Sequence, residues 1–303
     1  MRNAIGLSEE LQERCITFSR QLLLLGDGKL PFYDEHKKTV DISKVVSTST
    51  TLETTLNDFI VWCYPELRGA TDTMKIYDKA ILCALNDEVD AINKIAVNLL
   101  PGEGMQFFSA DEIDPNSTDR PGDYDIEYLH SISLGGIPPH ELILKIGTPV
   151  ILLRNLKPNL GLCNGTKLVV HRFTGDVTVE FQIVSGSHKG DIVSLPRIDF
   201  YTSESEFPFV LVRRQFPIRI AFAMTINKAQ GQSIKRVGLY LRRPVFTHGQ
   251  LYVALGRAGI PWETRCLLEP RPELQGKVEG KSRGEIAYIT VNEVYKEVFR
   301  KPM

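Results

Sequence analysis

Apolar and polar positions along the chain follow two periods, one typical of helices and one typical of strands. Residues 7, 11, 15, 18, 22 and 25 are apolar and recur at the spacing of an amphipathic helix that ends at Gly26. The same spacing predicts a helix over residues 86–100, directly after a short apolar run at 79–85 that indicates a strand. A further candidate helix covers residues 50–64.

The second half of the chain carries the pattern of a parallel sheet. Continuous apolar runs predict buried strands at residues 218–224 and 237–241, and residues 247–255 are typical of a helix. A strand, a polar loop, a second strand and a helix form the repeating unit of a parallel α/β sheet, whose chemistry lies in the loops at the carboxyl ends of the strands. We also expect a strand at 264–268 and a strand followed by a helix at 286–298.

A run of short strands lies between these two regions. Apolar residues at 142–153 are interrupted by Gly147-Thr148-Pro149, and shorter alternating strands are predicted at 167–173, 177–184 and 191–198. Several short strands separated by tight turns are typical of a small barrel.

Composition places the chain among ordinary globular proteins. Its 303 residues are 43% hydrophobic and 24% charged, which fits two domains, and no apolar run approaches the roughly 20 residues of a membrane span. The first residues lack the apolar core of a signal peptide. Five scattered cysteines indicate reduced thiols of an intracellular protein. The histidines at 130, 140, 171 and 188 are expected to stand alone, so no metal site is predicted.

Charge is distributed unevenly. Residues 207–258 contain no acid and nine basic residues, on a chain of net charge −1: Arg213, Arg214, Arg219, Lys228, Lys235, Arg236, Arg242, Arg243 and Arg257. Such an excess predicts one anion-binding face, and a solvated basic edge is the alternative. Residues 103–127 are acidic, and their irregular spacing favours a solvated loop over metal or general-acid chemistry.

The order of the residues in this basic region resembles two motifs of a known family. Arg214-Gln215-Phe216-Pro217, followed by residues 221–233 (AFAMTINKAQGQS), is similar to motif V of the petite-integration-frequency (Pif) family of superfamily 1 DNA helicases. Residues 249–258 (GQLYVALGRA) are similar to motif VI. The resemblance covers about nine tenths of the chain and identifies it as the C-terminal half of such a helicase, of the kind found in Helitron-type elements.

The resemblance implies an α/β fold in which a RecA-like parallel-sheet domain, the second motor domain, carries an inserted small SH3-like β-barrel. It assigns residues 1–30 to the tail of a missing first RecA-like domain. Residues 31–153 and 214–303 then form the second RecA-like domain, and residues 154–213 form the barrel. The turns and basic residues of the barrel are equally consistent with a structural scaffold and with a surface that binds the backbone of a DNA strand.

Roles for individual residues follow from the same resemblance. Arg257 matches the catalytic arginine that reaches the γ-phosphate of ATP, although an arginine capping a helix end is the alternative. The residues expected to contact DNA are Thr225, Asn227, Lys228, Arg154, Asn155 and Lys167. The residues expected to support the ATP cleft are Gln230, Gly231, Gln250 and Tyr252. Three positions depart from the family: Ala84 and Leu85 stand where the family usually has a Pro and a basic residue before Asn86, and Gly256 replaces a serine.

The sequence lacks the phosphate-binding loop GxxxxGK[ST]. Gly280-Lys281-Ser282 is the nearest match, but position 275 is Gln instead of the required Gly. ATP and Mg²⁺ are therefore expected as cofactors of an intact family enzyme, and this chain alone is expected to bind neither tightly.

The function implied is part of an ATP-dependent 5′-to-3′ DNA helicase of the DNA repair, recombination and telomere-maintenance type, inactive by itself. The alternatives are a noncatalytic single-stranded DNA-binding remnant and a regulatory fragment that depends on a partner. Expected partners are single-stranded DNA and the first RecA-like domain, in cis or in trans, without a membrane. The nucleus is the expected compartment, with the mitochondrion as the alternative.

Overall fold

The computed structural model describes residues 8–69, 76–117, 124–175, 177–203, 207–258, 260–282 and 284–295. The chain forms two compact units and passes between them four times. The first unit comprises Met1–Pro65, Asp78–Ile95 and Phe222–Met303, and the second comprises Glu66–Tyr77 and Ala96–Ala221.

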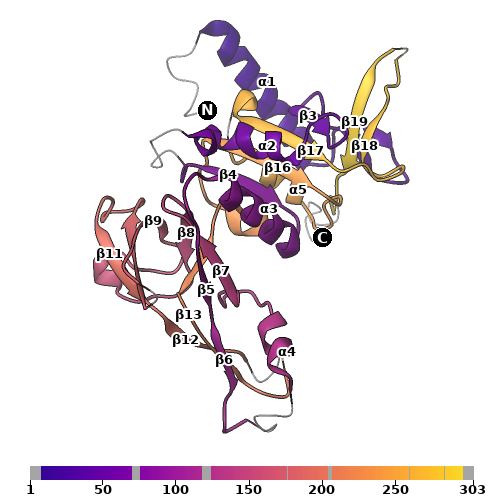
Figure 1. Ribbon diagram of the computed structural model, residues 1–303. Coiled ribbons are helices and arrows are strands. Elements are labelled where there is room, and N and C mark those ends of the chain that lie inside the picture. Colours follow the sequence, from indigo (N-terminus) through magenta and orange to yellow (C-terminus); the bar gives the residue numbers. More distant parts are fainter. Residues whose placement is uncertain are drawn as a thin grey trace, which may run out of the picture. The chain divides into compact units, whose positions relative to one another are not determined.

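A five-stranded parallel sheet forms the centre of the first unit (Figure 1). Its strand order is β15-β4-β16-β17-β3, and every neighbouring pair is parallel. The strands are β3 (Ser47–Thr50), β4 (Lys79–Cys83), β15 (Ala223–Thr225), β16 (Arg236–Leu241) and β17 (Thr264–Leu268). The predicted parallel α/β sheet is confirmed.

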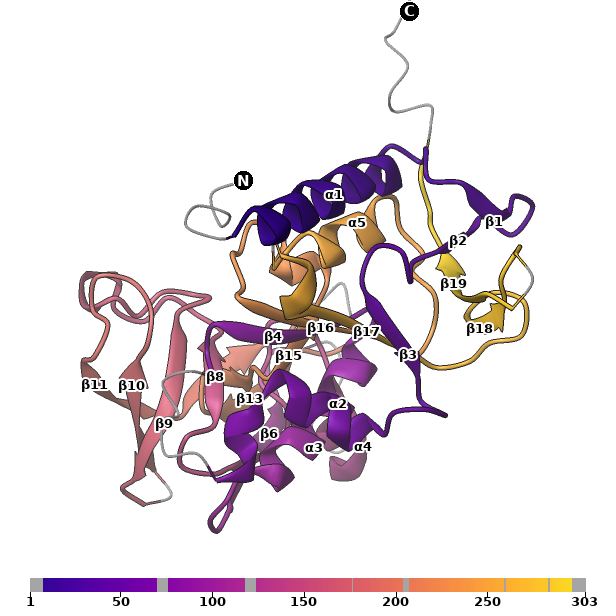
Figure 2. The ribbon, with the colours of Figure 1, turned by 90° about the horizontal axis from the view of Figure 1, so that it is seen from above.

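Helices cover both faces of this sheet. Figure 2 shows α1 (Glu9–Gly26) and α5 (Gln250–Leu255) on one face, with α2 (Leu56–Cys63) and α3 (Asn86–Leu99) on the other. Side chains alternate along each strand, so Ala80 and Leu82 of β4 join the core under α1 and α5. Short 3₁₀ turns follow β15 at η5 (Asn227–Ala229) and precede β17 at η6 (Pro261–Glu263).

Helix α1 is an integral part of the first unit. Phe18, Leu22 and Leu25 are buried in the same core as Leu251 and Leu255 of α5. Residues 8–30, which the resemblance assigns to the tail of a first RecA-like domain, thus lie in the same compact unit as the parallel sheet. A strong amphipathic pattern predicts a helix without saying which surface its apolar side covers.

A second sheet completes the first unit. Its four antiparallel strands follow the order β1-β2-β19-β18. The strands are β1 (Phe32–Asp34), β2 (Thr39–Asp41), β18 (Gly276–Glu279) and β19 (Ile286–Val291). The helix expected after β19 lies partly outside the described residues.

The second unit consists mainly of antiparallel sheets, with strand orders β11-β10-β9-β8-β14, β12-β13-β6 and β5-β7. The strands are β5 (Met105–Phe108), β6 (Ala110–Ile113), β7 (Glu141–Leu144), β8 (Pro149–Leu152), β9 (Lys167–Phe173), β10 (Thr178–Ile183), β11 (Ile192–Pro196), β12 (Ile198–Tyr201), β13 (Leu211–Gln215) and β14 (Ile218–Ile220). The helical elements are η2 (Pro65–Arg68), α4 (Ile126–Ser131) and η4 (Pro158–Leu160). Since β8 and β14 belong to the five-stranded sheet, this unit extends beyond the expected insert at 154–213 on both sides.

Three expected elements differ from the structure. Residues 218–224 form two strands in different units, because Ala221 donates its N–H to Pro149 while Phe222 accepts a hydrogen bond from Ile81. The expected strand at 191–198 is likewise divided between β11 and β12. The helix expected at 50–64 begins only at Leu56, where Thr55 accepts the N–H of Asp58 as its N-cap.

The acidic stretch 103–127 is not a solvated loop throughout. It contains β5 and β6, and Asp111 on β6 has a fully buried side chain that pairs with Arg213. Both residues lie in the second unit and are 102 positions apart. Residues 118–123 of this stretch are outside the described part of the chain.

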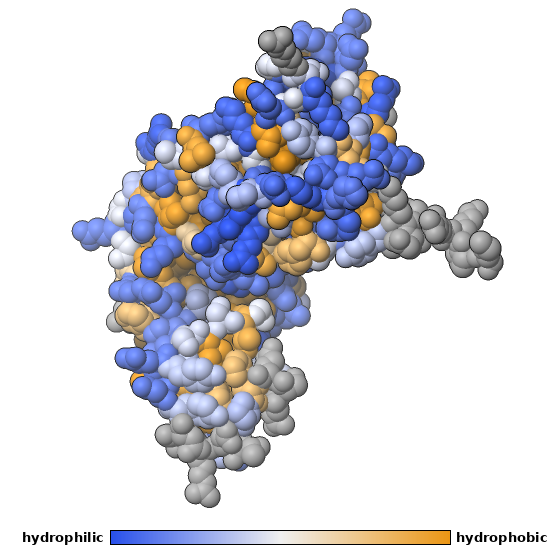
Figure 3. Space-filling model, turned by 90° about the vertical axis from the view of Figure 1, so that its right-hand side faces the viewer, coloured by the Kyte–Doolittle hydropathy of each residue, from blue (hydrophilic) through white to orange (hydrophobic). Residues whose placement is uncertain are grey.

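Apolar side chains at the surface do not gather in one place in the view of Figure 3, where they form separate patches among hydrophilic residues. Among the described residues, no helix combines the length and the apolar character needed to cross a membrane.

Candidate nucleic-acid and nucleotide interface

The loop after β15 carries the residues predicted to contact DNA. It is fixed at its start, because Ile226 is fully buried and donates its N–H to the carbonyl of Cys83 at the end of β4. Thr225 is half-buried at the end of β15, whereas Asn227 and Lys228 on η5 are exposed. The loop therefore presents polar side chains at the carboxyl edge of the parallel sheet, where such sheets bind ligands.

The next residues turn the chain towards α5. Gln230 and Gly231 are exposed, and Gly231 adopts φ 81°, a left-handed conformation that favours glycine. Gln232 donates its side-chain amide to the carbonyl of Lys228 at 2.9 Å. Ile234 then donates its N–H to the carbonyl of Arg257 at 3.4 Å. A backbone hydrogen bond thus joins the residue that follows the first motif to the second motif.

Gln250 and Tyr252, predicted to support an ATP cleft, have different surroundings. Gln250 is buried, and its Oε1 accepts the N–H groups of Phe246 and Thr247, so that it braces the loop before α5. Its Nε2 is buried without a hydrogen-bond partner among the described residues. Tyr252 is 36% exposed and its ring lies against Gly26, where an added Cβ would come within 2.9 Å of Cδ2.

Arg257 follows α5 and is half-buried. Its Nε donates to the carbonyl of Val253 at 2.9 Å, which is the helix-capping contact weighed as the alternative to a phosphate contact. In the described part of the chain no carboxylate pairs with Arg257. The terminal nitrogens of the guanidinium thus keep their capacity to donate to an anion, while Nε fixes the direction of the side chain.

The other residues predicted to contact DNA belong to the second unit. Arg154 is exposed and its guanidinium lies 4.6 Å from the ring centre of Phe200. Asn155 accepts the N–H of Asn164 at 2.8 Å, and Lys167 donates to the carbonyl of Tyr77 at 3.3 Å. Asn155 and Lys167 therefore also stabilise loops. The sequence grouped them with Thr225 and Lys228, but the structure assigns them to a different compact unit.

The basic residues on which the predicted anion-binding face rests do not all carry unpaired charge. The nine basic residues are divided between both units. Five of them pair with carboxylates of other segments: Arg213 with Asp111, Arg214 with Asp199, Lys235 with Asp78, Arg236 with Glu263 and Arg242 with Glu269. Counting charges within 207–258 missed these acids because they lie elsewhere in the sequence.

A group of potential metal ligands lies around Asp111. His130 and His140, which were expected to stand alone, are stacked with ring centres 3.7 Å apart, and ligand atoms of all three residues lie within 4.8 Å of one another. However, the Asp111 carboxylate already accepts hydrogen bonds from Arg213 and Ser109. Parallel stacked rings also direct their nitrogen lone pairs side by side instead of towards a shared ion. This arrangement favours a structural cluster over a metal centre.

The family model described as "DNA helicase Pif1, 2B domain" matches residues 127–173, within the second unit. The ATP-dependent DNA helicase PIF1 of Rattus norvegicus is 33% identical over 179 residues, which is 58% of this chain and 25% of the relative. Human PIF1 is 32% identical over 180 residues, with the same coverage.

Over these matched segments the chain is similar to Pif1-family DNA helicases. It spans about a quarter of the length of these curated relatives. Solved Pif1 structures share its fold: the Pif1 helicase of Candida albicans aligns with a TM-score of 0.55 at 22% identity, covering 85% of this chain and 54% of that one. Bacteroides Pif1 in complex with ADP-AlF3 and ssDNA aligns with a TM-score of 0.52 at 17% identity, covering 82% and 48%.

The turn between β4 and α3 is held by an acid that was not among the predicted site residues. Glu88 is buried, and its Oε2 accepts the N–H groups of Ala84 and Leu85. Burial raises the pKa of Glu88, and its other oxygen, Oε1, has no partner among the described residues. An acid in the first turn of a helix, three residues after Leu85, is the signal that could have revealed this capping role.

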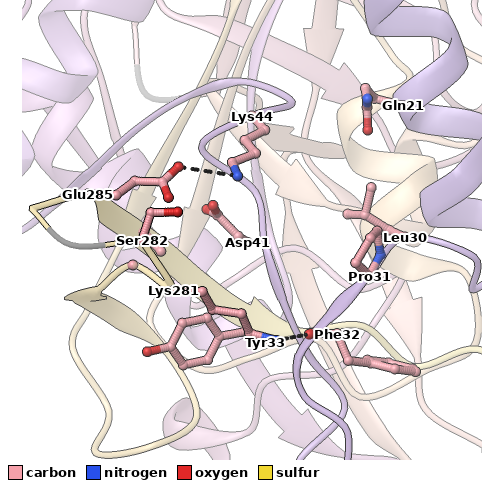
Figure 4. Close-up of a pocket in the computed structure, with 12 residues that line it drawn as sticks. Gln21, Leu30, Pro31, Phe32, Tyr33, Asp41, Lys44, Lys281, Ser282 and Glu285 are labelled. Carbon is pink, nitrogen blue, oxygen red and sulfur yellow. Dashed lines mark hydrogen bonds and ion pairs between the residues drawn. The ribbon is translucent and has the colours of Figure 1, made fainter.

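A separate pocket of about 300 Å³ lies beside the hairpin of β18 and β19 (Figure 4). Lys44 pairs with Glu285 at 3.2 Å and Lys281 donates to the carbonyl of Phe32, so its charged groups are engaged within the protein. Ser282 lines it as well, but none of the predicted site residues does. This pocket is distinct from the carboxyl edge of the parallel sheet.

Proposed function

We propose that this chain is the second motor half of an ATP-dependent 5′-to-3′ DNA helicase and that the loop after β15 binds the backbone of single-stranded DNA. The observation that supports it most is the position of Thr225, Asn227 and Lys228 at the carboxyl edge of the parallel sheet. A hydroxyl, an amide and an ammonium group suit phosphate oxygens, which carry no sequence information.

ATP would bind between this chain and a first RecA-like domain. Arg257 would stabilise the charge that develops on the transferring phosphoryl group, because its guanidinium is anchored through Nε and pairs with no described acid. The hydrogen bond between Ile234 and Arg257 would connect that arginine to the DNA-binding loop. Gln230, Gly231, Gln250 and Tyr252 would support this connection.

Hydrolysis by these 303 residues alone is not expected. The sequence holds no GxxxxGK[ST] loop, and that loop supplies the backbone N–H groups and the lysine that hold the β- and γ-phosphates, and the hydroxyl that binds Mg²⁺. We further propose that the five-stranded sheet of the second unit is an SH3-like barrel. Arg154, Asn155 and Lys167 would be its contacts with DNA. The expected compartment remains the nucleus, with the mitochondrion as the alternative.

Fluorescence anisotropy with a labelled single-stranded oligonucleotide tests the DNA-binding part. Binding should weaken as salt rises, because bound phosphates release counterions. The double variant Thr225→Ala/Lys228→Ala should weaken binding at low salt, while Lys29→Ala, an exposed lysine paired with Asp27, serves as the matched control. Salt-independent binding, or equal loss in both variants, would contradict the proposal.

ATP hydrolysis in the presence of a separately produced first RecA-like domain of a Pif1 relative tests the catalytic part. Activity should require both proteins and should fall by about a thousandfold in Arg257→Ala. DNA binding without any reconstituted hydrolysis would favour the noncatalytic DNA-binding alternative. Regulation of an already active partner would favour the regulatory alternative.

A further inference from the structure

Trp62, at the end of α2, lies beneath two arginines of the first unit. The guanidinium of Arg265 is 4.6 Å from the centre of its ring, and that of Arg236 is 5.4 Å away. Arg236 begins β16, whereas Arg265 is the second residue of β17. The cluster therefore lies at the amino edge of the parallel sheet, opposite the edge that carries Thr225 and Lys228.

A close contact between α2 and the sheet creates this arrangement (Figure 1). Gly238 on β16 faces Phe59 of α2, and an added Cβ would come within 2.9 Å of the Phe59 ring. Phe59 and Trp62 are one helical turn apart and their rings stack with centres 6.1 Å apart. Because Phe59 is held in the core, Trp62 is placed at the sheet edge beside β17, where Arg265 pairs in register with Gly238.

The two arginines differ in their partners. Arg236 is fully engaged: Nε and Nη2 donate to the carboxylate of Glu263, and Nη1 donates to the carbonyl of Trp62. Arg265 is exposed and pairs with no carboxylate in the described part of the chain. Burial and the neighbouring Arg236 lower the pKa of Arg265. Two guanidinium groups here share a single acid, so the site lacks one negative charge.

We propose that Trp62 and Arg265 form a docking site for an acidic segment of a partner protein, in which a carboxylate binds Arg265 and a neighbouring apolar side chain packs on Trp62. A planar guanidinium binds a carboxylate through two parallel hydrogen bonds. Tryptophan and arginine are also the residues most enriched at the energetic centres of protein interfaces.

A carboxylate fits this site better than a nucleic-acid backbone. Backbone binding relies on several cations that neutralise successive phosphates. At this edge Lys235 already pairs with Asp78 at 2.7 Å and Arg236 pairs with Glu263. Among the described residues, Arg265 pairs with no carboxylate and lies next to an aromatic surface, and a single acid with an apolar neighbour matches that combination.

The fluorescence of Trp62 provides a direct test, because the chain has only two tryptophans. In a Trp262→Phe background, emission reports on the site itself. We would titrate this full chain with a peptide of repeated Glu-Glu-Phe, with the uncharged Gln-Gln-Phe analogue, and with oligothymidylate. The acidic peptide should change the emission saturably, and the uncharged peptide should bind about tenfold more weakly or not at all.

Variants separate the site from the rest of the surface. Arg265→Gln should lower the affinity for the acidic peptide about tenfold. The affinity of Arg265→Lys should lie between those of Arg265→Gln and the parent chain, because lysine keeps the charge and loses the planar guanidinium. Arg14→Gln is the matched control, since Arg14 lies over Trp262 instead. Lys228→Ala should leave peptide binding unchanged, which separates this test from that of the proposed DNA site.

Three results would overturn the proposal. The first is an emission of Trp62 that the acidic peptide does not alter. The second is equal affinity for the peptide in Arg265→Gln and in the parent chain, with urea midpoints showing that both are folded. The third is a response to oligothymidylate in place of the acidic peptide, which would assign the site to nucleic acid.

Discussion

Removing the charge of Asp111 should destabilise the second unit more than any surface substitution. Asp111 has a fully buried side chain and Arg213 is 1% exposed. Nε of Arg213 lies 3.0 Å from Oδ1 and Nη2 lies 2.7 Å from Oδ2 of Asp111. The remaining donors of the guanidinium reach the carbonyls of Leu129, Ile132 and Pro138. One ion pair thus joins β6, β13 and the segment around α4.

The expected loss in the free energy of unfolding follows from the burial of this ion pair. Asp111→Asn keeps the shape of the side chain but leaves a buried guanidinium without a counterion, a change that costs about 3–5 kcal/mol. The double variant Asp111→Leu/Arg213→Met removes both charges and leaves three carbonyls without their donor, at about 1 kcal/mol or more each. Its cost should therefore be well below the summed costs of the single variants Asp111→Leu and Arg213→Met, because the first substitution already removes the interaction.

Urea unfolding followed by far-UV circular dichroism measures these differences. Trp62 and Trp262 both lie in the first unit, so tryptophan fluorescence follows that unit separately. Asp199→Asn is the matched control, since Asp199 pairs with the adjacent Arg214 in an exposed position. Exposed pairs contribute little to stability, so the control should unfold close to the parent chain.

Two results would refute this reasoning. If Asp111→Asn shifted the dichroism transition no more than Asp199→Asn does, burial would not be the source of the pair's contribution. If the losses in unfolding free energy of the two single variants added up to the loss in the double variant, Asp111 and Arg213 would not interact. An unchanged fluorescence midpoint in all variants is expected, because the pair lies outside the first unit.

Two other perturbations test the packing of each unit. Gly238→Ala should destabilise the first unit by about 1–3 kcal/mol, because the added Cβ would lie 2.9 Å from Phe59, and urea unfolding followed by tryptophan fluorescence measures it. An unchanged midpoint would show that α2 moves away at no cost. Burial and the neighbouring His130 lower the pKa of His140 below 6.5, so the unfolded chain binds more protons just below that pH. Stability should therefore fall as pH drops from 6.5 through the folded pKa, and His140→Phe should remove that part of the pH dependence measured by urea midpoints. An identical slope in the variant would contradict this.

Local patterns predicted the elements of the first unit well. Both kinds of pattern depend only on neighbours a few positions apart: the spacing of apolar residues in α1 and α3, and the apolar runs of β4, β16 and β17. Such local patterns are the same in any fold that buries these elements. The resemblance of residues 221–233 to a helicase motif selected residues that lie at the carboxyl edge of the parallel sheet.

Contacts between distant segments were not predictable in the same way. The nine basic residues of 207–258 suggested a single face, but the partner of Arg213 lies 102 positions earlier. Trp62 and Arg265 carried no motif, and the packing of α2 on β16 together with the parallel register of β16 and β17 brings them together. A charge count along the sequence cannot show which acids fold back onto which bases.

The junction at Ala221 and Phe222 explains both the failure of one prediction and the position of the candidate site. Residues 218–224 are apolar apart from the buried Arg219, and hydrophobicity alone therefore gave one strand. Yet Ala221 bonds to Pro149 in the second unit, and Phe222 bonds to Ile81 in the first. Thr225 follows three residues after Phe222, so the DNA-contacting loop proposed here is attached to that junction by the shortest strand of the parallel sheet.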